Sequence, residues 1–62
     1  MQAGKTYRHK IHGACVKVLE LVPTSYGTDA VSVVLKSGKC PLAYPVGKER
    51  LLDTRSNMWE TP

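Results

Sequence analysis

Apolar and polar residues alternate along the first third of the chain. Residues 6–11 place Tyr7, His9 and Ile11 on one side of an extended segment and polar residues on the other. This period of two predicts a half-buried β-strand. Residues 14–22 contain leucine and glutamate, which suit a helix. Their valines and their Gly and Pro boundaries favour a second strand, because branched side chains lose freedom in helices and pack well on a sheet.

The middle of the chain predicts a hairpin. Residues 23–29 combine turn formers with polar residues and have the composition of a loop. Residues 30–35 alternate again, with Val31, Val33 and Leu35 on one face and the residues between them on the other. A short turn at residues 37–39 follows, with a glycine where a positive φ is needed.

A fourth strand is predicted over residues 40–44. Cys40, Leu42 and Tyr44 share one face of this segment. Proline has no backbone N–H to donate to a neighbouring strand, and prolines stand at positions 41 and 45. The fourth strand is therefore expected to be short and to lie at an edge or a bulge.

The end of the chain completes the predicted fold. Residues 46–48 suit a single helical turn, residues 50–54 a fifth strand, and residues 55–62 a tail without periodicity. Five short strands with tight turns predict an all-β fold, a small five-stranded SH3-like barrel with one short 3-10 turn and an irregular C-terminal tail. A five-stranded oligonucleotide-binding barrel is the alternative. The chain is expected to be one domain over residues 1–62, with its core over about residues 5–54.

The length of the chain limits its core. A chain of 62 residues buries only about 60% of the surface that it exposes when unfolded. Such a core contributes about 3–5 kcal/mol, so barrel closure, a covalent staple or self-association is expected to add to it. A homo-oligomer is therefore among the expected assemblies.

Several short motifs resemble the plasmid-encoded type II dihydrofolate reductases. The residues that carry the resemblance are Tyr44-Pro45-Val46 and Glu49-Arg50-Leu51 after a Ser37-Gly38 turn, with weaker likeness at Tyr7-Arg8-His9-Lys10, at Gly13 and from Gly27 to Leu35. That family implies an SH3-like barrel that assembles as a homotetramer around one central pore. The opening Tyr7-Arg8-His9 with Gly13, followed by Val16, Val18 and Leu19, is also similar to small phage and bacterial domains of unknown function.

The pore motif of that family is not retained. The family reads Val-Gln-Ile-Tyr where this chain has Pro41-Leu42-Ala43-Tyr44. The glutamine would contact both pterin and cofactor, whereas Leu42 has neither a donor nor an acceptor. The resemblance therefore supports the fold and argues against the activity. A reductase-like homotetramer is the third-ranked hypothesis.

The excess of positive charge lies at the N-terminal end. The net charge is +4; residues 1–19 contain four basic residues and no acidic one, and five bases match five acids in the remainder. A one-sided basic surface attracts polyanions, nucleic acid first. The alternative is that the charge only keeps a small protein in solution. The residues predicted to bind nucleic acid, by phosphate contacts and base stacking, are Arg8, Lys10, Lys17, Tyr7 and Tyr26.

A protein partner is the second hypothesis. A small accessory protein of a phage or mobile element would bind or inhibit a host protein complex, and aromatic residues are enriched at the centres of such interfaces. Tyr26, Met58 and Trp59 are the predicted anchors. The alternative for Trp59 is that it packs against the barrel.

Catalytic and metal chemistry have weak support. His9, His12, Cys15 and Cys40 contain the ligand types of a zinc site, but the spacing of three puts consecutive candidates on opposite faces of a strand. No nucleophile motif surrounds either cysteine. We therefore expect a non-enzymatic binding module without metal or cofactor.

The expected compartment is the cytoplasm, because the N-terminus lacks the apolar stretch of a signal peptide and no apolar run is long enough to span a membrane. Thiols stay reduced there, so the two cysteines are expected to be free, with a disulfide between them as the alternative.

Overall fold

Five antiparallel strands form one sheet in the computed structural model, which describes all residues from 1 to 62. The strands are β1 (Thr6–His9), β2 (Cys15–Thr24), β3 (Gly27–Lys36), β4 (Glu49–Asp53) and β5 (Trp59–Glu60). Their order across the sheet is β4-β3-β2-β1-β5. The prediction of an all-β protein with five strands is confirmed, and the structure contains no helix.

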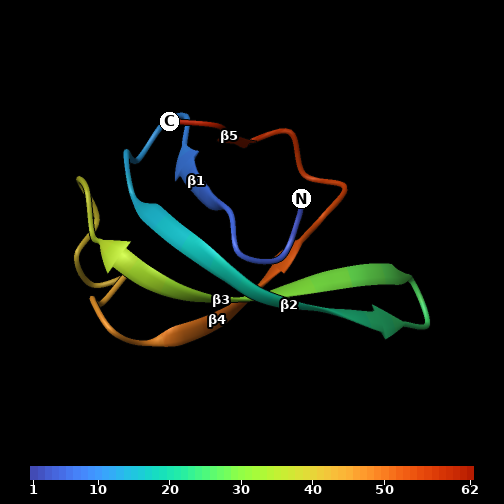
Figure 1. Ribbon diagram of the computed structural model, residues 1–62. Helices are drawn as coiled ribbons and strands as arrows, with labels where there is room; N and C mark the ends of the chain where they lie inside the picture. Colours follow the sequence, from blue (N-terminus) through green and yellow to red (C-terminus); the bar gives the residue numbers. More distant parts are fainter.

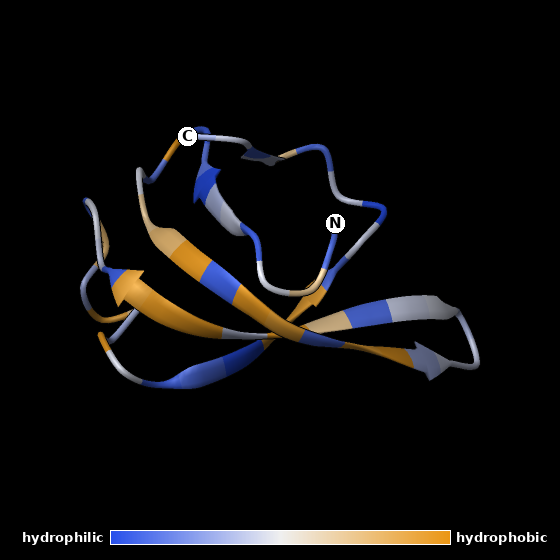
Figure 2. Ribbon diagram, in the orientation of Figure 1, coloured by the Kyte–Doolittle hydropathy of each residue, from blue (hydrophilic) through white to orange (hydrophobic).

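The sheet is bent so that β1 and β5 form an upper layer over the long β2–β3 hairpin and β4 (Figure 1). The most apolar stretches follow β2 and β3 (Figure 2). Seven hydrophobic residues are buried between the layers: Ala14, Val16, Val18, Ala30, Val34, Tyr44 and Leu52. Most of them are small, so the two layers approach each other closely.

Alternation decides which face of β3 is buried. Ala30, Ser32 and Val34 have at most 1% of their surface exposed, whereas Val31 and Val33 are half-buried on the other face. A buried hydroxyl needs a partner, and the Ser32 Oγ donates a hydrogen bond of 3.0 Å to the carbonyl oxygen of Arg50. The polar residue in the core therefore fastens β3 to β4 rather than weakening the sheet.

The predicted loop over residues 23–29 is wrong in extent. β2 runs to Thr24 and β3 starts at Gly27, so only Ser25 and Tyr26 lie between the paired strands. The Thr24 hydroxyl accepts a hydrogen bond from the backbone N–H of Tyr26 and donates one to the carbonyl of Gly27. These bonds satisfy the polar groups of a turn that the composition alone assigned to a longer loop.

The predicted strand over residues 40–44 is also wrong. The carbonyl oxygen of Cys40 accepts hydrogen bonds from the N–H groups of Ala43 (3.1 Å) and Tyr44 (3.0 Å), so the chain turns back on itself. Leu42 is 98% exposed and Tyr44 only 6% exposed, which separates two side chains that an extended strand would have kept on one face.

The expected single helical turn at residues 46–48 is instead a β-turn. The N–H of Lys48 donates to the carbonyl of Pro45 at 3.2 Å. Gly47 has a φ of 83°, which a right-handed helical turn excludes and which the third position of a type II turn requires.

The tail is not irregular throughout, and β1 is shorter than predicted. In β5, Trp59 pairs with His9 and Glu60 with Arg8, so β5 becomes an edge strand beside β1. β1 ends at His9, and Ile11 is 61% exposed on the following turn rather than part of the buried face. β5 had no periodicity because a strand of two residues is too short to show one, and its order comes from pairing with β1.

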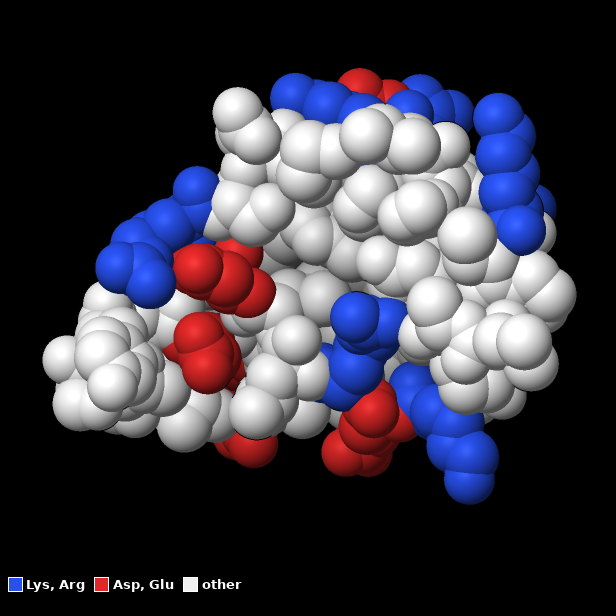
Figure 3. All heavy atoms as spheres, turned by 180° about the vertical axis from the view of Figure 1, so that it is seen from behind, with Lys and Arg blue, Asp and Glu red and all other residues white.

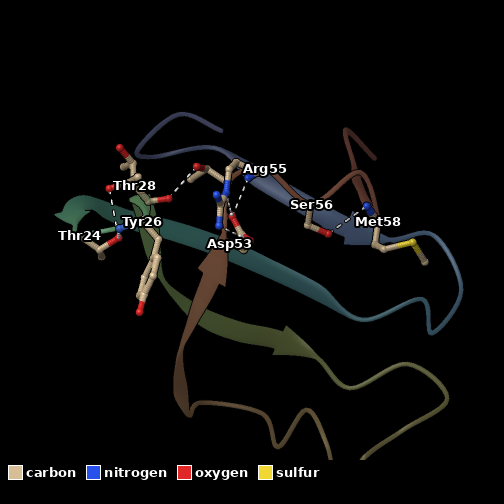
Figure 4. A network of polar contacts seen from close by, with 9 residues as sticks. Thr24, Tyr26, Thr28, Asp53, Arg55, Ser56 and Met58 are labelled. Atoms are coloured by element: carbon tan, nitrogen blue, oxygen red, sulfur yellow. Dashed lines mark hydrogen bonds and ion pairs between the residues drawn. The ribbon is translucent and has the colours of Figure 1, made fainter.

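Side-chain hydrogen bonds secure the crossing from β4 to β5 (Figure 4). The Thr54 hydroxyl donates to the carbonyl of Thr28 at 2.6 Å. The Asp53 carboxylate accepts from the backbone N–H of Arg55 at 2.9 Å and from its guanidinium at 3.2 Å. This local ion pair lowers the pKa of Asp53 through hydrogen bonds from Arg55.

Among the glycines, Gly38 makes the tightest approach to another part of the backbone. A Cβ atom at this position would lie 2.2 Å from the carbonyl oxygen of His12 and 2.6 Å from the backbone nitrogen of Ala14, and the φ of Gly38 is 66°. Gly47 also has a positive φ, but a Cβ there would meet no atom within 4 Å. A substitution at Gly47 therefore costs only the strain of a positive φ, whereas a substitution at Gly38 costs the same strain and a steric clash as well.

We expect Gly38→Ala to destabilise the protein by more than about 3 kcal/mol, because backbone atoms must move in addition to the strain of about 1–2 kcal/mol for a non-glycine residue at positive φ. Gly47→Ala, the matched control, should lose only that strain. Urea unfolding followed by Trp59 fluorescence measures both. Equal losses in the two variants would contradict a tight contact at Gly38.

Candidate functional site

Two turns meet at the end of the sheet opposite the β2–β3 hairpin tip. The first turn, residues 10–13, follows β1, and the second, residues 37–42, follows β3. The N–H of Lys39 donates to the carbonyl of His12 at 2.8 Å, and the N–H of Gly13 to the carbonyl of His9 at 3.0 Å. We call the surface formed by residues 10–13 and 37–42 the two-turn surface.

The buried side chain of His9 holds the first turn in place by hydrogen bonds. Its side chain is 8% exposed, and its Nδ1 accepts hydrogen bonds from the N–H groups of Ile11 (3.2 Å) and His12 (3.1 Å). A ring nitrogen that accepts two hydrogen bonds carries no proton, so the imidazole is neutral. Burial lowers the pKa of His9, and the nearby His12 and Arg50 lower it further.

Aromatic rings close the end of the core under the two turns. The His9 ring stacks on His12 with centroids 4.5 Å apart and meets the Trp59 ring edge-on at 4.9 Å. The Arg50 guanidinium lies 4.2 Å from the centre of the Tyr44 ring and donates to the carbonyl of Ala43 at 2.7 Å. The second turn is thus held against β4 by a cation–π contact and a charge-assisted hydrogen bond.

The structure brings Cys40 and His12 together. Their Sγ and Nδ1 atoms are 3.2 Å apart, within hydrogen-bond distance. Sequence reasoning missed this contact because 28 residues separate the pair and neither residue lies in a recognisable motif. The pair forms because the two turns lie against each other, and the sequence of neither turn predicts the contact.

The other residues considered for zinc binding are not assembled. The Nδ1 of His9 is engaged by backbone donors, and Cys15 lies on β2 with its thiol 3.9 Å from the carbonyl of Gly13. No three histidine, cysteine or acidic side chains are close enough together to hold a metal ion. Both cysteines are free.

Of the five residues predicted to bind nucleic acid, four lie on or next to the paired strands β1 and β2, and Tyr26 lies at the hairpin tip. Arg8 forms an ion pair with Glu60 at 2.6 Å, which offsets its charge and, with the associated hydrogen bond, raises its pKa. Tyr7 is half-buried against the core, and its hydroxyl accepts from the N–H of Gln2 at 2.8 Å. Tyr26 is 81% exposed at the hairpin tip.

The two predicted lysines have different surroundings. Lys17 is exposed on β2 between its neighbours Thr6 and Val33. Lys10 is exposed on the two-turn surface, where Lys39 joins it. Sequence reasoning missed Lys39 because its charge was counted against acidic residues that lie elsewhere on the molecule.

The three predicted protein-binding residues are not gathered either. Trp59 is half-buried beside His9, with its ring 6.0 Å from Tyr44, which supports packing against the core. The backbone N–H of Met58 donates a hydrogen bond to the hydroxyl oxygen of Ser56, and the backbone carbonyl of Met58 accepts one from the backbone N–H of Lys10. Tyr26 and Met58 lie on opposite sides of the Asp53–Arg55 pair in Figure 4. Binding of a protein through these residues stays a prediction.

Seen from behind, basic side chains are distributed around the outline of the molecule, and several have acidic neighbours (Figure 3). Only two ion pairs form, Arg8–Glu60 and Arg55–Asp53. Lys10 and Lys39 belong to neither, so the charge of the two-turn surface is not offset by an ion pair.

Comparisons of the chain with protein-family models, with curated proteins and with solved structures found no match. The resemblance to type II dihydrofolate reductases therefore stays an expectation. Tyr44, the pore-motif residue that the chain retains, is buried beneath Arg50. No helix of the structure is long and apolar enough to cross a membrane.

The buried, neutral His9 predicts a loss of stability in mild acid. Its pKa is lowered in the folded state, so the unfolded chain takes up a proton first as the pH falls below its ordinary value of about 6.5. The contribution of neutral His9 to the free energy of unfolding is therefore fully present above about pH 6.5. It is lost as the pH falls from about 6.5 toward the lowered pKa of the folded state. We expect the free energy of unfolding, measured in urea between pH 7.5 and 5, to fall accordingly.

His9→Asn is the matched variant for this prediction. The Asn Oδ1 can accept the hydrogen bonds that reach Nδ1 of His9 but does not titrate. The variant should be less stable at neutral pH, because the ring contacts are lost, and its stability should change less between pH 7.5 and 5. An unchanged pH dependence would assign the effect to another group.

Proposed function

We propose that the protein is a small, non-enzymatic binding module that binds nucleic acid through the two-turn surface. The observation that carries the proposal is the hydrogen bond of 2.8 Å from the Lys39 N–H to the carbonyl of His12. It fixes the turn that carries Lys39 against the turn that carries Lys10. Two exposed lysines that form no ion pair are thereby carried on neighbouring turns at one end of the sheet.

The chain around this surface contains no negative charge. No acidic residue occurs before Glu20 or between Asp29 and Glu49, so both turns and their flanking residues are free of Asp and Glu. Glu60, which lies beside β1, is occupied by Arg8. An unopposed group of lysines attracts phosphates and releases counterions from them, which makes binding dependent on salt.

Exposed apolar groups accompany the lysines. Ile11 is 61% exposed on the first turn and Leu42 is 98% exposed on the second. They offer apolar contact to unpaired bases, and lysines beside them would contact the backbone phosphates. This combination supports a single-stranded ligand, whose bases are accessible.

We propose further that the bent sheet is an SH3-like barrel. The support is the five-stranded antiparallel order in which β1 and β5 cover the inner face of β2, β3 and β4. The pore and the homotetramer implied by the reductase resemblance are not part of this proposal, because Leu42 takes the place of the ligand-contacting glutamine.

Fluorescence anisotropy with labelled single-stranded oligonucleotides tests the function. Binding should weaken steeply as salt rises, and Lys39→Gln should weaken it and lower the slope of log K against log salt by about one. The same loss is expected for Lys10→Gln.

Lys5→Gln is the matched control, because it removes the same charge from an exposed lysine outside the two turns. It should leave the slope nearly unchanged. Absence of binding even at low salt, or equal effects of Lys39→Gln and Lys5→Gln, would contradict the proposed surface.

A further inference from the structure

The outer face of the sheet carries apolar side chains that nothing covers. An antiparallel sheet with one solvated face usually alternates apolar residues inward with polar residues outward. Here Leu51 is 63% exposed and Leu19 and Leu35 are each 45% exposed. The outer apolar face consists of Leu19, Val31, Val33, Leu35 and Leu51.

Two irregularities in the pairing of β2 with β3 contribute to this face. Val18 pairs with Ser32 and Glu20 with Val31, so Leu19 is an extra residue on the outer side. Val16 pairs with Val34 and Cys15 with Lys36, which leaves Leu35 unpaired in the same way. Each bulge places a leucine among residues that already face outward.

Strand register arranges charges in rows across the same face, because directly paired residues place their side chains on one side of a sheet. One row runs Lys17, Val33 and Glu49, and the next runs Glu20, Val31 and Leu51. Beyond these two rows, Lys36 lies toward the two turns and Asp29 toward the hairpin tip.

Along β2 and β3, the outer face is therefore basic at one end, apolar in the middle and acidic at the other. Lys17 and Lys36 stand at the basic end, and Glu20 and Asp29 at the acidic end. On β4, Glu49 shares the row of Lys17, and Asp53, which forms an ion pair with Arg55, shares the row of Asp29. A rotation of 180° about an axis that crosses the strands between Val31 and Val33 exchanges these ends. Along β2 and β3 the face is thus complementary to a copy of itself, and on β4 the rotation places Glu49 opposite Leu51 of the other copy.

We propose that this face is the interface of a twofold-symmetric homodimer. In the dimer, Val33 of one copy packs on Val31 of the other, and Lys17 and Lys36 of one copy face Glu20 and Asp29 of the other. A symmetric dimer uses the same patch on both subunits, and this arrangement forms each contact twice. Opposite charges at the ends fix the register that the apolar centre alone would leave free.

A second copy explains the charge order better than an unrelated partner. A foreign protein would need an acidic end opposite Lys17 and a basic end opposite Glu20, whereas this chain already supplies both at the required spacing. The small core of a 62-residue chain also gains from burying this face.

Sedimentation without nucleic acid tests the proposal at neutral pH and low salt. The protein should sediment with a mass of 13.6 kDa, twice the 6.8 kDa of the chain. Lys17→Glu and Glu20→Lys should each yield monomers, because like charges then meet at both symmetric contacts. An equimolar mixture of the two variants should restore the dimer, since each contact in the heterodimer again joins opposite charges.

Lys5→Glu, which makes the same charge change outside this face, should remain dimeric. Circular dichroism and urea unfolding of each variant verify that it is folded. A monomeric wild-type protein at the highest soluble concentration would overturn the proposal. A dimer that survives Lys17→Glu, or a mixture that stays monomeric, would also overturn it. These outcomes are independent of the oligonucleotide measurements, which report on the two turns.

Discussion

The close approach of Gly38 to the backbone of residues 12–14 is the contact on which the functional end of the molecule depends. Because no side chain separates the two turns, the Lys39 N–H reaches the carbonyl of His12, and Cys40 reaches its ring. The same crossing directs the chain so that Tyr44 enters the core beside His9. One close contact between two distant segments of the backbone thus positions lysines, a thiol and the aromatic rings at the end of the core.

The elements that could be predicted from the sequence are those whose order is local. β1, the first part of β2 and most of β3 alternate, and the inward residues Val16, Val18, Ala30 and Val34 form most of the core. The strand expected over residues 50–54 is also present, as β4. The segment after Gly38 alternates in the same way. There, however, the carbonyl of Cys40 accepts hydrogen bonds from two N–H groups of its own turn, so the segment does not pair with a strand of the sheet. β5 was missed for the opposite reason: two residues have no period, and pairing with β1 alone makes them a strand.

Charge illustrates the difference between a segment and a surface. The N-terminal excess of positive charge is real, yet Glu60, from the far end of the chain, lies against Arg8. Lys39, in the balanced part of the sequence, has no acid beside it because Glu49 and Asp53 lie on β4 and Asp29 lies near the hairpin tip. Ion pairs between exposed groups contribute little to stability. Here the ion pairs instead determine where on the surface positive charge is left to attract an anionic ligand.

His9 links the stability of the core to the shape of the binding surface. Protonation in mild acid would add a positive charge beneath the lysines, which by itself favours a phosphate ligand. The same proton would occupy Nδ1 and leave the part-buried N–H groups of Ile11 and His12 without their acceptor. The neutral imidazole is therefore the form that accepts both hydrogen bonds and holds the first turn, which carries Lys10, in the observed arrangement.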